Sequence, residues 1–260
     1  MKIAGLVPHA LLVMMTGCSY QLVSPPARMV NLESARSAAP GETIVGVKGA
    51  AHSAVFDAGA AIGTAEVRHG VGHGVEVDAE ATYVRVLEQD DPEIDRNIYA
   101  ARGGFKMSNA DGWAAVLGGV GGGISPAAGG FLAADLGGTI SYPNCYAVPY
   151  LGGTVFASQP VAAKRVDFRG SDGSVVGYDT ANTTLGFGAS TGVEIPLDRA
   201  RCRTGMTPAR IQIGLGMDVL RPVNGEPRLV PATDDMSMQL TTQAKTLASM
   251  GLAAGIEFPF

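Results

Sequence analysis

Residues 247–260 read LASMGLAAGIEFPF, and this stretch decides the fold. From position 250 onward every second side chain is apolar, whereas the intervening side chains are small or polar. The apolar set consists of Met250, Leu252, Ala254, Ile256, Phe258 and Phe260. Successive side chains of a strand point to opposite faces. The stretch therefore predicts a β-strand with one apolar face and one polar face.

The same alternation recurs along the chain and predicts ten strands. They cover residues 42–52, 57–69, 72–88, 95–107, 111–124, 128–142, 145–158, 182–196, 208–222 and 247–260. Each is long enough to cross a bilayer, because ~9–11 tilted residues suffice for a strand. A strand that ends on an aromatic residue such as Phe260 resembles the closing strand of bacterial outer-membrane β-barrels. The resemblance implies an all-β fold, an antiparallel up-and-down transmembrane barrel over residues 42–260, and recognition of Phe260 by the barrel-assembly machinery.

The lengths of the connections support ten strands. With the N-terminus on the periplasmic side, the two longest connections, 159–181 and 223–246, both fall outside, and the C-terminus falls inside. Small barrels have an even strand number, short periplasmic turns and longer external loops. Connection 159–181 is expected to continue as a hairpin that turns at 171–173. A barrel of eight strands remains an alternative if the first pair is short.

The N-terminus reads as a targeting segment. Residues 1–17 hold one Lys and an apolar run, and they resemble a lipoprotein signal peptide with Met15-Thr16-Gly17-Cys18 as the lipobox. The resemblance implies that Cys18 carries the lipid, palmitate included, and that the protein is anchored to the outer membrane on its periplasmic side. Residues 18–41, rich in Ser, Pro and Ala, are then expected to form a periplasmic tether. An ordinary cleaved signal or a retained anchor helix are the alternatives.

Composition excludes some classes of protein. A net charge of −5 and a pI near 5.4 argue against a nucleic-acid partner, which requires a basic face. The sequence has no internal run of ~20 apolar residues, the length that a membrane-spanning helix needs.

The polar faces of the expected strands carry charges of both signs. In a closed barrel these side chains point into the lumen, and a barrel this narrow is filled mostly by side chains. The expected lumen charges are Lys48, Glu66, Arg68, Glu76, Asp78, Glu80, Arg102, Lys106, Asp135, Glu194, Arg210, Asp218 and Glu257. One interpretation is a paired polar core that blocks flow. The other is a narrow cation-preferring path, because the acids outnumber the bases.

Two further cysteines, Cys145 and Cys202, fall in or beside neighbouring inside connections. Both would face the oxidising periplasm, where disulfides persist. A disulfide between them is possible if their Cα atoms lie within ~7 Å, and two free thiols are the alternative.

The sequence contains no motif that predicts a catalytic or metal site. Residues 188–192 match G-x-S-x-G, but the pattern lies inside an expected strand and no histidine follows His73. The nucleophile elbow requires a strand-to-helix turn and a later histidine. His69 and His73 flank a turn and lack the further ligands that a metal site needs. We therefore expect no catalytic residues, no metal and no cofactor.

The sequence favours a lipid-anchored outer-membrane barrel with a largely plugged polar lumen and a structural or surface-interaction role. A small passive channel is the alternative, and a membrane-embedded enzyme is a weaker one. The expected partners are outer-membrane lipid and lipopolysaccharide, the latter through divalent cations at residues 90–91 and 234–235. We expect a monomer.

Overall fold

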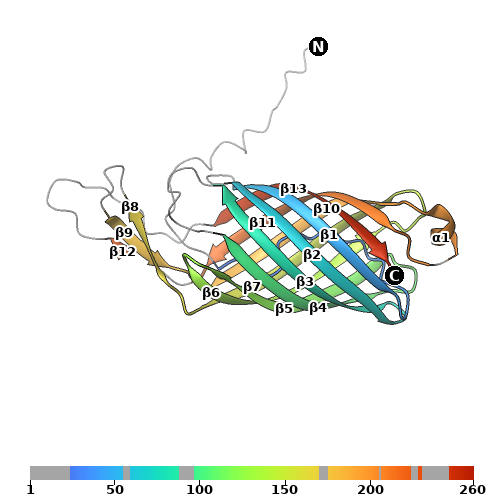
Figure 1. The fold of residues 1–260 in the computed structure, drawn as a ribbon, viewed down its shortest axis with the longest axis horizontal. Coiled ribbons are helices and arrows are strands. Elements are labelled where there is room, and N and C mark those ends of the chain that lie inside the picture. Colours follow the sequence, from blue (N-terminus) through green and yellow to red (C-terminus); the bar gives the residue numbers. More distant parts are fainter. Residues whose placement is uncertain are drawn as a thin grey trace, which may run out of the picture.

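A closed barrel makes up most of the computed structural model, which describes residues 24–54, 59–87, 97–169, 175–204, 206–223, 228–229 and 246–260. Ten of the described strands form it, all antiparallel, and β1 pairs with β13 to close it (Figure 1). The barrel strands are β1 (Thr43–Ala54), β2 (Gly59–Gly72), β3 (Val75–Leu87), β4 (Ile98–Ser108), β5 (Ala114–Ser125), β6 (Gly129–Ser141), β7 (Val148–Val161), β10 (Thr184–Pro196), β11 (Arg210–Pro222) and β13 (Leu247–Pro259). The prediction of ten strands is confirmed, and the alternative of eight is wrong. No strand boundary differs from its predicted position by more than three residues.

Period-two alternation holds around the barrel, as β13 illustrates. The side chain of Leu252 is 64% exposed on the outer surface, whereas Glu257 is fully buried on the inner one. Leu252 lies opposite Leu215 of β11 and Ala51 of β1, so the outward rows of neighbouring strands are in register. A slip of one residue would reverse every side chain of the strand. The apolar face of residues 247–260 therefore points outward, as predicted.

The two ends of the barrel differ. The short-turn end carries connections 73–74, 109–113, 142–147 and 197–209, the last containing α1 (Arg199–Arg203), and it also holds the C-terminus (Figure 1). The long-loop end carries connections 162–183 and 223–246. There β8 (Arg165–Arg169), β9 (Val175–Thr180) and β12 (Arg228–Leu229) form a three-stranded sheet beyond the barrel. The expected hairpin is thus present, although its turn at 171–173 lies outside the described residues.

Residues 24–41, which we call the inner segment, lie inside the barrel. The segment has almost no regular secondary structure, yet most of its side chains are buried. Arg28 bonds to Glu80 on β3, and Ser34 bonds to Glu194 on β10. These two strands lie on opposite sides of the closed barrel, so a chain that contacts both runs through the lumen. The prediction of a tether outside the barrel is therefore wrong for residues 24–41, and residues 18–23 lie outside the described part of the chain.

Apolar packing also holds the inner segment in the lumen. Val30 and Leu32 of the segment are buried against Ile62, Val84 and Tyr150 of the wall. Burying such side chains contributes ~1.5–3 kcal/mol each relative to leaving them exposed. The lumen thus has an apolar part as well as a charged part. Among the described residues, no helix is long and apolar enough to cross a membrane.

Candidate functional site in the barrel lumen

The structure places all the charged residues predicted for the lumen on the inner face of the barrel. Most of them are buried, and Asp78, Asp135 and Asp218 are partly exposed. The buried ones are Lys48, Glu66, Arg68, Glu76, Glu80, Arg102, Lys106, Glu194, Arg210 and Glu257. They form one connected network with the inner segment, which the sequence analysis had assigned to a tether.

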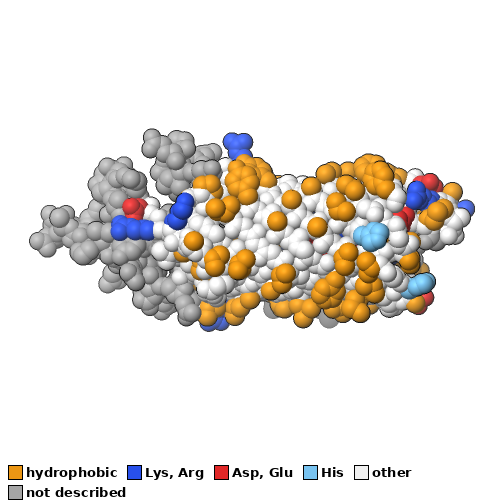
Figure 2. All heavy atoms as spheres, turned by 60° about the horizontal axis from the view of Figure 1, so that its bottom comes forward, with side chains coloured by type: hydrophobic (Ala, Val, Ile, Leu, Met, Phe, Trp, Pro, Cys, Tyr) orange, Lys and Arg blue, Asp and Glu red, His pale blue; other side chains and the backbone are white. Residues whose placement is uncertain are grey.

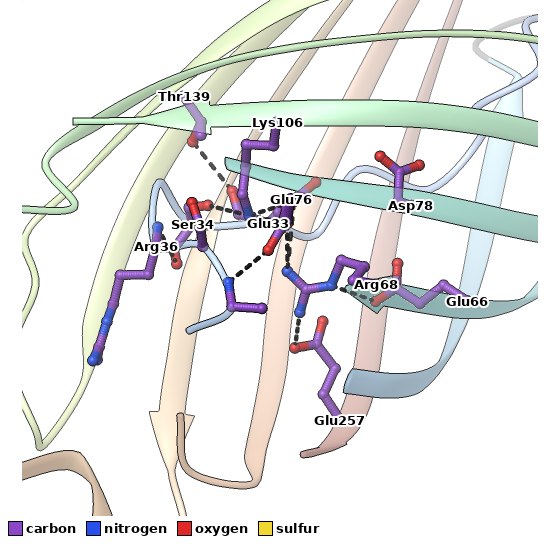
Figure 3. A network of polar contacts seen from close by, with 12 residues as sticks. Glu33, Ser34, Arg36, Glu66, Arg68, Glu76, Asp78, Lys106, Thr139 and Glu257 are labelled. Carbon is purple, nitrogen blue, oxygen red and sulfur yellow. Dashed lines mark hydrogen bonds and ion pairs between the residues drawn. The ribbon is translucent and has the colours of Figure 1, made fainter. Parts of the chain in front are cut away.

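Glu33 of the inner segment is the hub of this network. Its carboxylate accepts a hydrogen bond from Lys106 Nζ at 2.5 Å and pairs with Arg28 at 2.8 Å (Figure 3). Arg68 Nη1 lies 3.6 Å from the same carboxylate. The backbone carbonyl of Glu33 accepts a hydrogen bond from the Thr139 hydroxyl at 3.1 Å. One acid on the segment therefore joins bases of β2 and β4 to a hydroxyl of β6.

A second group surrounds the guanidinium of Arg68, which is fully buried. Arg68 pairs with Glu76 at 3.2 Å and with Glu257 on the closing strand (Figure 3). Its Nε lies 3.7 Å from Glu66, and Glu66 in turn pairs with Lys48 at 2.6 Å. These contacts link β1, β2, β3 and β13, so they cross the seam between the first and last strands.

The third group binds the segment to β10. The amide and hydroxyl of Ser34 each donate to the Glu194 carboxylate at 2.8 Å. Arg210 Nη1 pairs with the same carboxylate at 2.9 Å, and its Nε contacts Glu257. Gln212 donates to both Glu194 and Glu257, at 3.2 and 2.8 Å. Each of the two acids therefore has several donors.

The fourth group lies nearer the long-loop end. Arg102 forms a two-point pair with Asp135 at 2.7 and 2.8 Å and contacts Asp78 at 2.5 Å. Arg28 pairs with Glu80 at 2.7 Å. Bidentate pairs of this kind are among the stronger charge-assisted hydrogen bonds.

In this network each buried charge contacts a side chain of opposite charge, and buried charges require such partners. A buried ion without a partner costs several kcal/mol, and breaking a buried pair by removing one partner costs about 3–5 kcal/mol. The network therefore fixes the segment relative to several strands.

A small cavity lies beside the segment in the lumen. It has a volume of about 30 Å³ and lies between the segment and β1, β10, β11 and β13. His52 and Asp218 line it, with Nδ1 and Oδ2 3.9 Å apart, and so does Ser190, whose buried hydroxyl has no hydrogen-bond partner. A volume of this size suits about one or two water molecules. Ser190 lies within β10 and not at a strand-to-helix turn, so the G-x-S-x-G match is not a nucleophile elbow.

Cys145 and Cys202 meet at the short-turn end. The structure joins them in a disulfide, with Cα atoms 5.7 Å apart. Cys202 lies on α1, whose first turn is capped by the Asp198 carboxylate accepting from the Arg201 amide at 3.0 Å. The bridge therefore ties α1 to connection 142–147. Among the described residues, no group of three or more His, Cys, Asp and Glu side chains has the arrangement of a metal site.

The network residues that come from the inner segment were not predicted from the sequence. Arg28, Glu33 and Ser34 lie in a stretch without hydrophobic periodicity, so alternation gave no signal for them. The available signal was the excess of acids over bases among the predicted lumen residues, because the unmatched acids need partners from elsewhere in the chain. Gln212 was not among the predicted lumen residues because only charged residues were considered. It lies two positions after Arg210 on β11, so its side chain also points inward.

The outer surface is apolar along its length. Figure 2 shows hydrophobic side chains over the barrel wall in view, with charged side chains gathered toward its two ends. Aromatic side chains occur near both ends. The rings of Tyr83 and Tyr99 lie 5.2 Å apart at a tilt of 41° toward the long-loop end, and those of Trp113 and Tyr142 meet edge to face at 5.4 Å toward the short-turn end.

Comparison with known proteins gives a resemblance of fold. No protein-family model matches the chain, and no curated protein sequence matches it. Among solved structures, an outer-membrane channel from Pseudomonas putida F1 has 12% identity and a TM-score of 0.44, covering 88% of this chain and 100% of that one. The β-domain of the Bordetella autotransporter BrkA has 11% identity and a TM-score of 0.40, covering 85% and 99%. Neisserial surface protein A has 12% identity and a TM-score of 0.36, covering 84% and 96%. At these scores the resemblances carry no argument about function.

Proposed function

We propose that this chain is an outer-membrane β-barrel with a structural or surface-interaction role, whose lumen is closed to flow by its own inner segment. The observation that carries the proposal is the pairing of Glu33 with Lys106 and Arg28 inside the barrel. Ion pairs to β3 and β4 and a hydrogen bond from Ser34 to Glu194 of β10 hold the segment across the lumen. A barrel of this width has little room beside such a segment.

The membrane location is supported by the outer surface. A monomeric soluble protein rarely exposes a large contiguous apolar area. Here large apolar side chains are exposed on the barrel wall, among them Val120 at 68% and Leu252 at 64%. Aromatic residues near both ends fit the girdles that flank the apolar band of transmembrane barrels.

Two partners and one contact surface follow from this proposal. Arg85 and Arg221, exposed near the long-loop end, suit the phosphates of lipopolysaccharide; the acidic pairs 90–91 and 234–235 lie outside the described residues. The sheet of β8, β9 and β12 offers a contact surface at the same end. Phe260 is 78% exposed and its backbone pairs with Thr43 at the seam, so it is available to the assembly machinery.

We propose that Cys18 is acylated. The anchor is proposed to lie at the long-loop end and not on the periplasmic side, because Ser24 bonds to Thr184 where β10 begins. We propose no catalytic role, since Ser190 lies within β10 and not at the strand-to-helix turn that a nucleophile elbow requires.

Planar-bilayer recording of the purified protein tests the closed lumen. We expect no stepwise conductance, with a porin of known conductance in the same membrane as the positive control. Reproducible steps from the folded wild-type protein would replace this proposal with a small passive channel.

A further inference from the structure

We propose that the protein displays its N-terminus at the long-loop end, so that a group attached to Cys18, an acyl chain included, enters the membrane leaflet at that end. In an outer membrane this leaflet is the outer one, and that assignment rests on the function proposed above.

The direction of the inner segment carries the proposal. At one end the Ser24 amide donates to the Asn182 carbonyl at 3.2 Å and to the Thr184 hydroxyl at 2.9 Å, where β10 begins at the long-loop end. At the other end the Gly41 amide donates to the Gly70 carbonyl at 2.7 Å, beside the first short turn.

Contacts between these ends follow in order along the barrel. Arg28 meets Glu80 in the middle of β3. The Ala35 amide donates to Ser141 Oγ at the last residue of β6, and the Ala38 amide donates to Glu76 near the start of β3. Both of these strand ends lie at the short-turn end. The segment therefore traverses the barrel once, from long loops to short turns.

Chain length prevents residue 18 from returning to the short-turn end. Ser24 follows Cys18 by six positions, and a chain of that length spans at most about 20 Å. A strand of 13 residues such as β13 is about 43 Å long at ~3.3 Å per residue, or about 33 Å of barrel height at a tilt near 40°. The lumen also holds the segment itself, with about 30 Å³ of cavity beside it.

The topology allows the segment to enter the barrel during assembly. The segment directly precedes β1, and β1 forms the seam with β13. Closing the barrel therefore joins its first and last strands. A segment laid against the inner face of β2 and β3 is enclosed when this seam forms, with no need to pull an acylated end through a finished barrel.

Three epitope-tagged variants test the proposal in intact cells. One tag stands between Ser19 and Tyr20, which leaves the lipobox unchanged. The second stands between Asp172 and Gly173 at the long-loop end, and the third between Ala110 and Asp111 at the short-turn end. Antibody binding is measured before and after the outer membrane is permeabilised, and heat-modifiable gel mobility verifies that each barrel is folded.

We expect the first tag to behave like the second, with full binding on intact cells, and the third to gain its signal only after permeabilisation. If the first tag instead behaves like the third while the second is accessible, the proposal is overturned and the function proposed above survives. If the second tag is inaccessible on intact cells and the third is accessible, the orientation in the proposed function fails. In that case the display proposal holds if the first tag shows the same accessibility as the second, and it is overturned if the first tag shows the accessibility of the third.

A measurement on the purified protein decides the remaining case, in which no tag binds antibody before permeabilisation. Arg28 is 8% exposed inside the barrel. Trypsin should leave the bond after Arg28 intact in the folded protein and cleave it once the barrel is unfolded by heating in detergent. Cleavage after Arg28 in folded protein would overturn the passage of the segment through the lumen, and the direction of display with it.

Discussion

The Nζ atom of Lys106, on β4, lies 2.5 Å from the Glu33 carboxylate, on a segment that precedes the first strand of the barrel. Both side chains are almost fully buried, with 1% and 2% of their surface exposed. The same ammonium contacts Glu76 at 2.8 Å. One buried base is therefore shared between the wall and the inner segment, and the stability of the barrel depends on the segment.

Glu33→Ala should lower the free energy of unfolding by about 3–5 kcal/mol, because it removes the acid shared by three buried bases. The matched control is Glu42→Ala, since Glu42 pairs with Arg201 at 3.2 Å at a partly exposed site. That change should cost less than about 1 kcal/mol. Urea unfolding followed by the fluorescence of Trp113, the single tryptophan, measures both. Equal costs for the two variants would mean that the Glu33 contacts do not stabilise the fold.

The bridge between Cys145 and Cys202 should stabilise the short-turn end. The two residues are 57 positions apart, and closing a loop of this length contributes about 4 kcal/mol in the chain-entropy model. Denatured protein alkylated without reductant should carry no label at either position, and Cys202→Ser should unfold at a lower denaturant concentration. Labelled peptides containing both cysteines from freshly isolated membranes would exclude the bridge.

Cys18→Ala should abolish incorporation of radioactive palmitate, because the lipobox offers this thiol as the acceptor. Ser19→Ala is the matched control and should keep the label. Labelling that persists in Cys18→Ala would remove the lipid from the proposal while leaving the barrel and the path of its inner segment untouched.

The strands were predictable because each one alternates between side chains that face outward and side chains that face the lumen. This alternation is visible within the strand itself. In β11 the outward Ile213 and Leu215 alternate with the inward Gln212 and Gly214, and no long-range information is needed to see this. The lengths of the connections then supplied the even strand number. Strand 111–124 was harder to predict because Leu117, which faces inward, is apolar and 1% exposed.

The inner segment was not predictable in the same way. An extended chain surrounded by the barrel contacts wall residues on all sides, so its side chains have no period of two. Pro25 and Pro26 lower its strand propensity further. Its partners lie far away in the sequence, as with Ser34 and Glu194, 160 residues apart. The Ser, Pro and Ala content that suggested a tether reflects a chain whose backbone bonds to lumen side chains.

Leu252→Arg tests whether the outward face contacts lipid. Leu252 lies in the middle of β13 and is 64% exposed. In a bilayer its replacement by Arg should destabilise the barrel by about 2–4 kcal/mol, whereas an exposed substitution in water usually changes stability by less than about 0.5 kcal/mol. The matched control is Met206→Arg, because Met206 is 48% exposed in connection 197–209, beyond the strands. Its cost should stay below about 0.5 kcal/mol.

Ala253 is a poorer comparison for Leu252, because it faces inward and packs against the apolar cluster around Val30 and Leu32. An arginine there would be destabilising for steric reasons. The free energies of unfolding of Leu252→Arg and Met206→Arg are therefore measured by urea titration in lipid bilayers, with heat-modifiable mobility in outer-membrane fractions as a second readout. Equal and small costs for both variants would show that Leu252 faces water, and the barrel would then have to be a soluble one with an apolar surface covered by another protein.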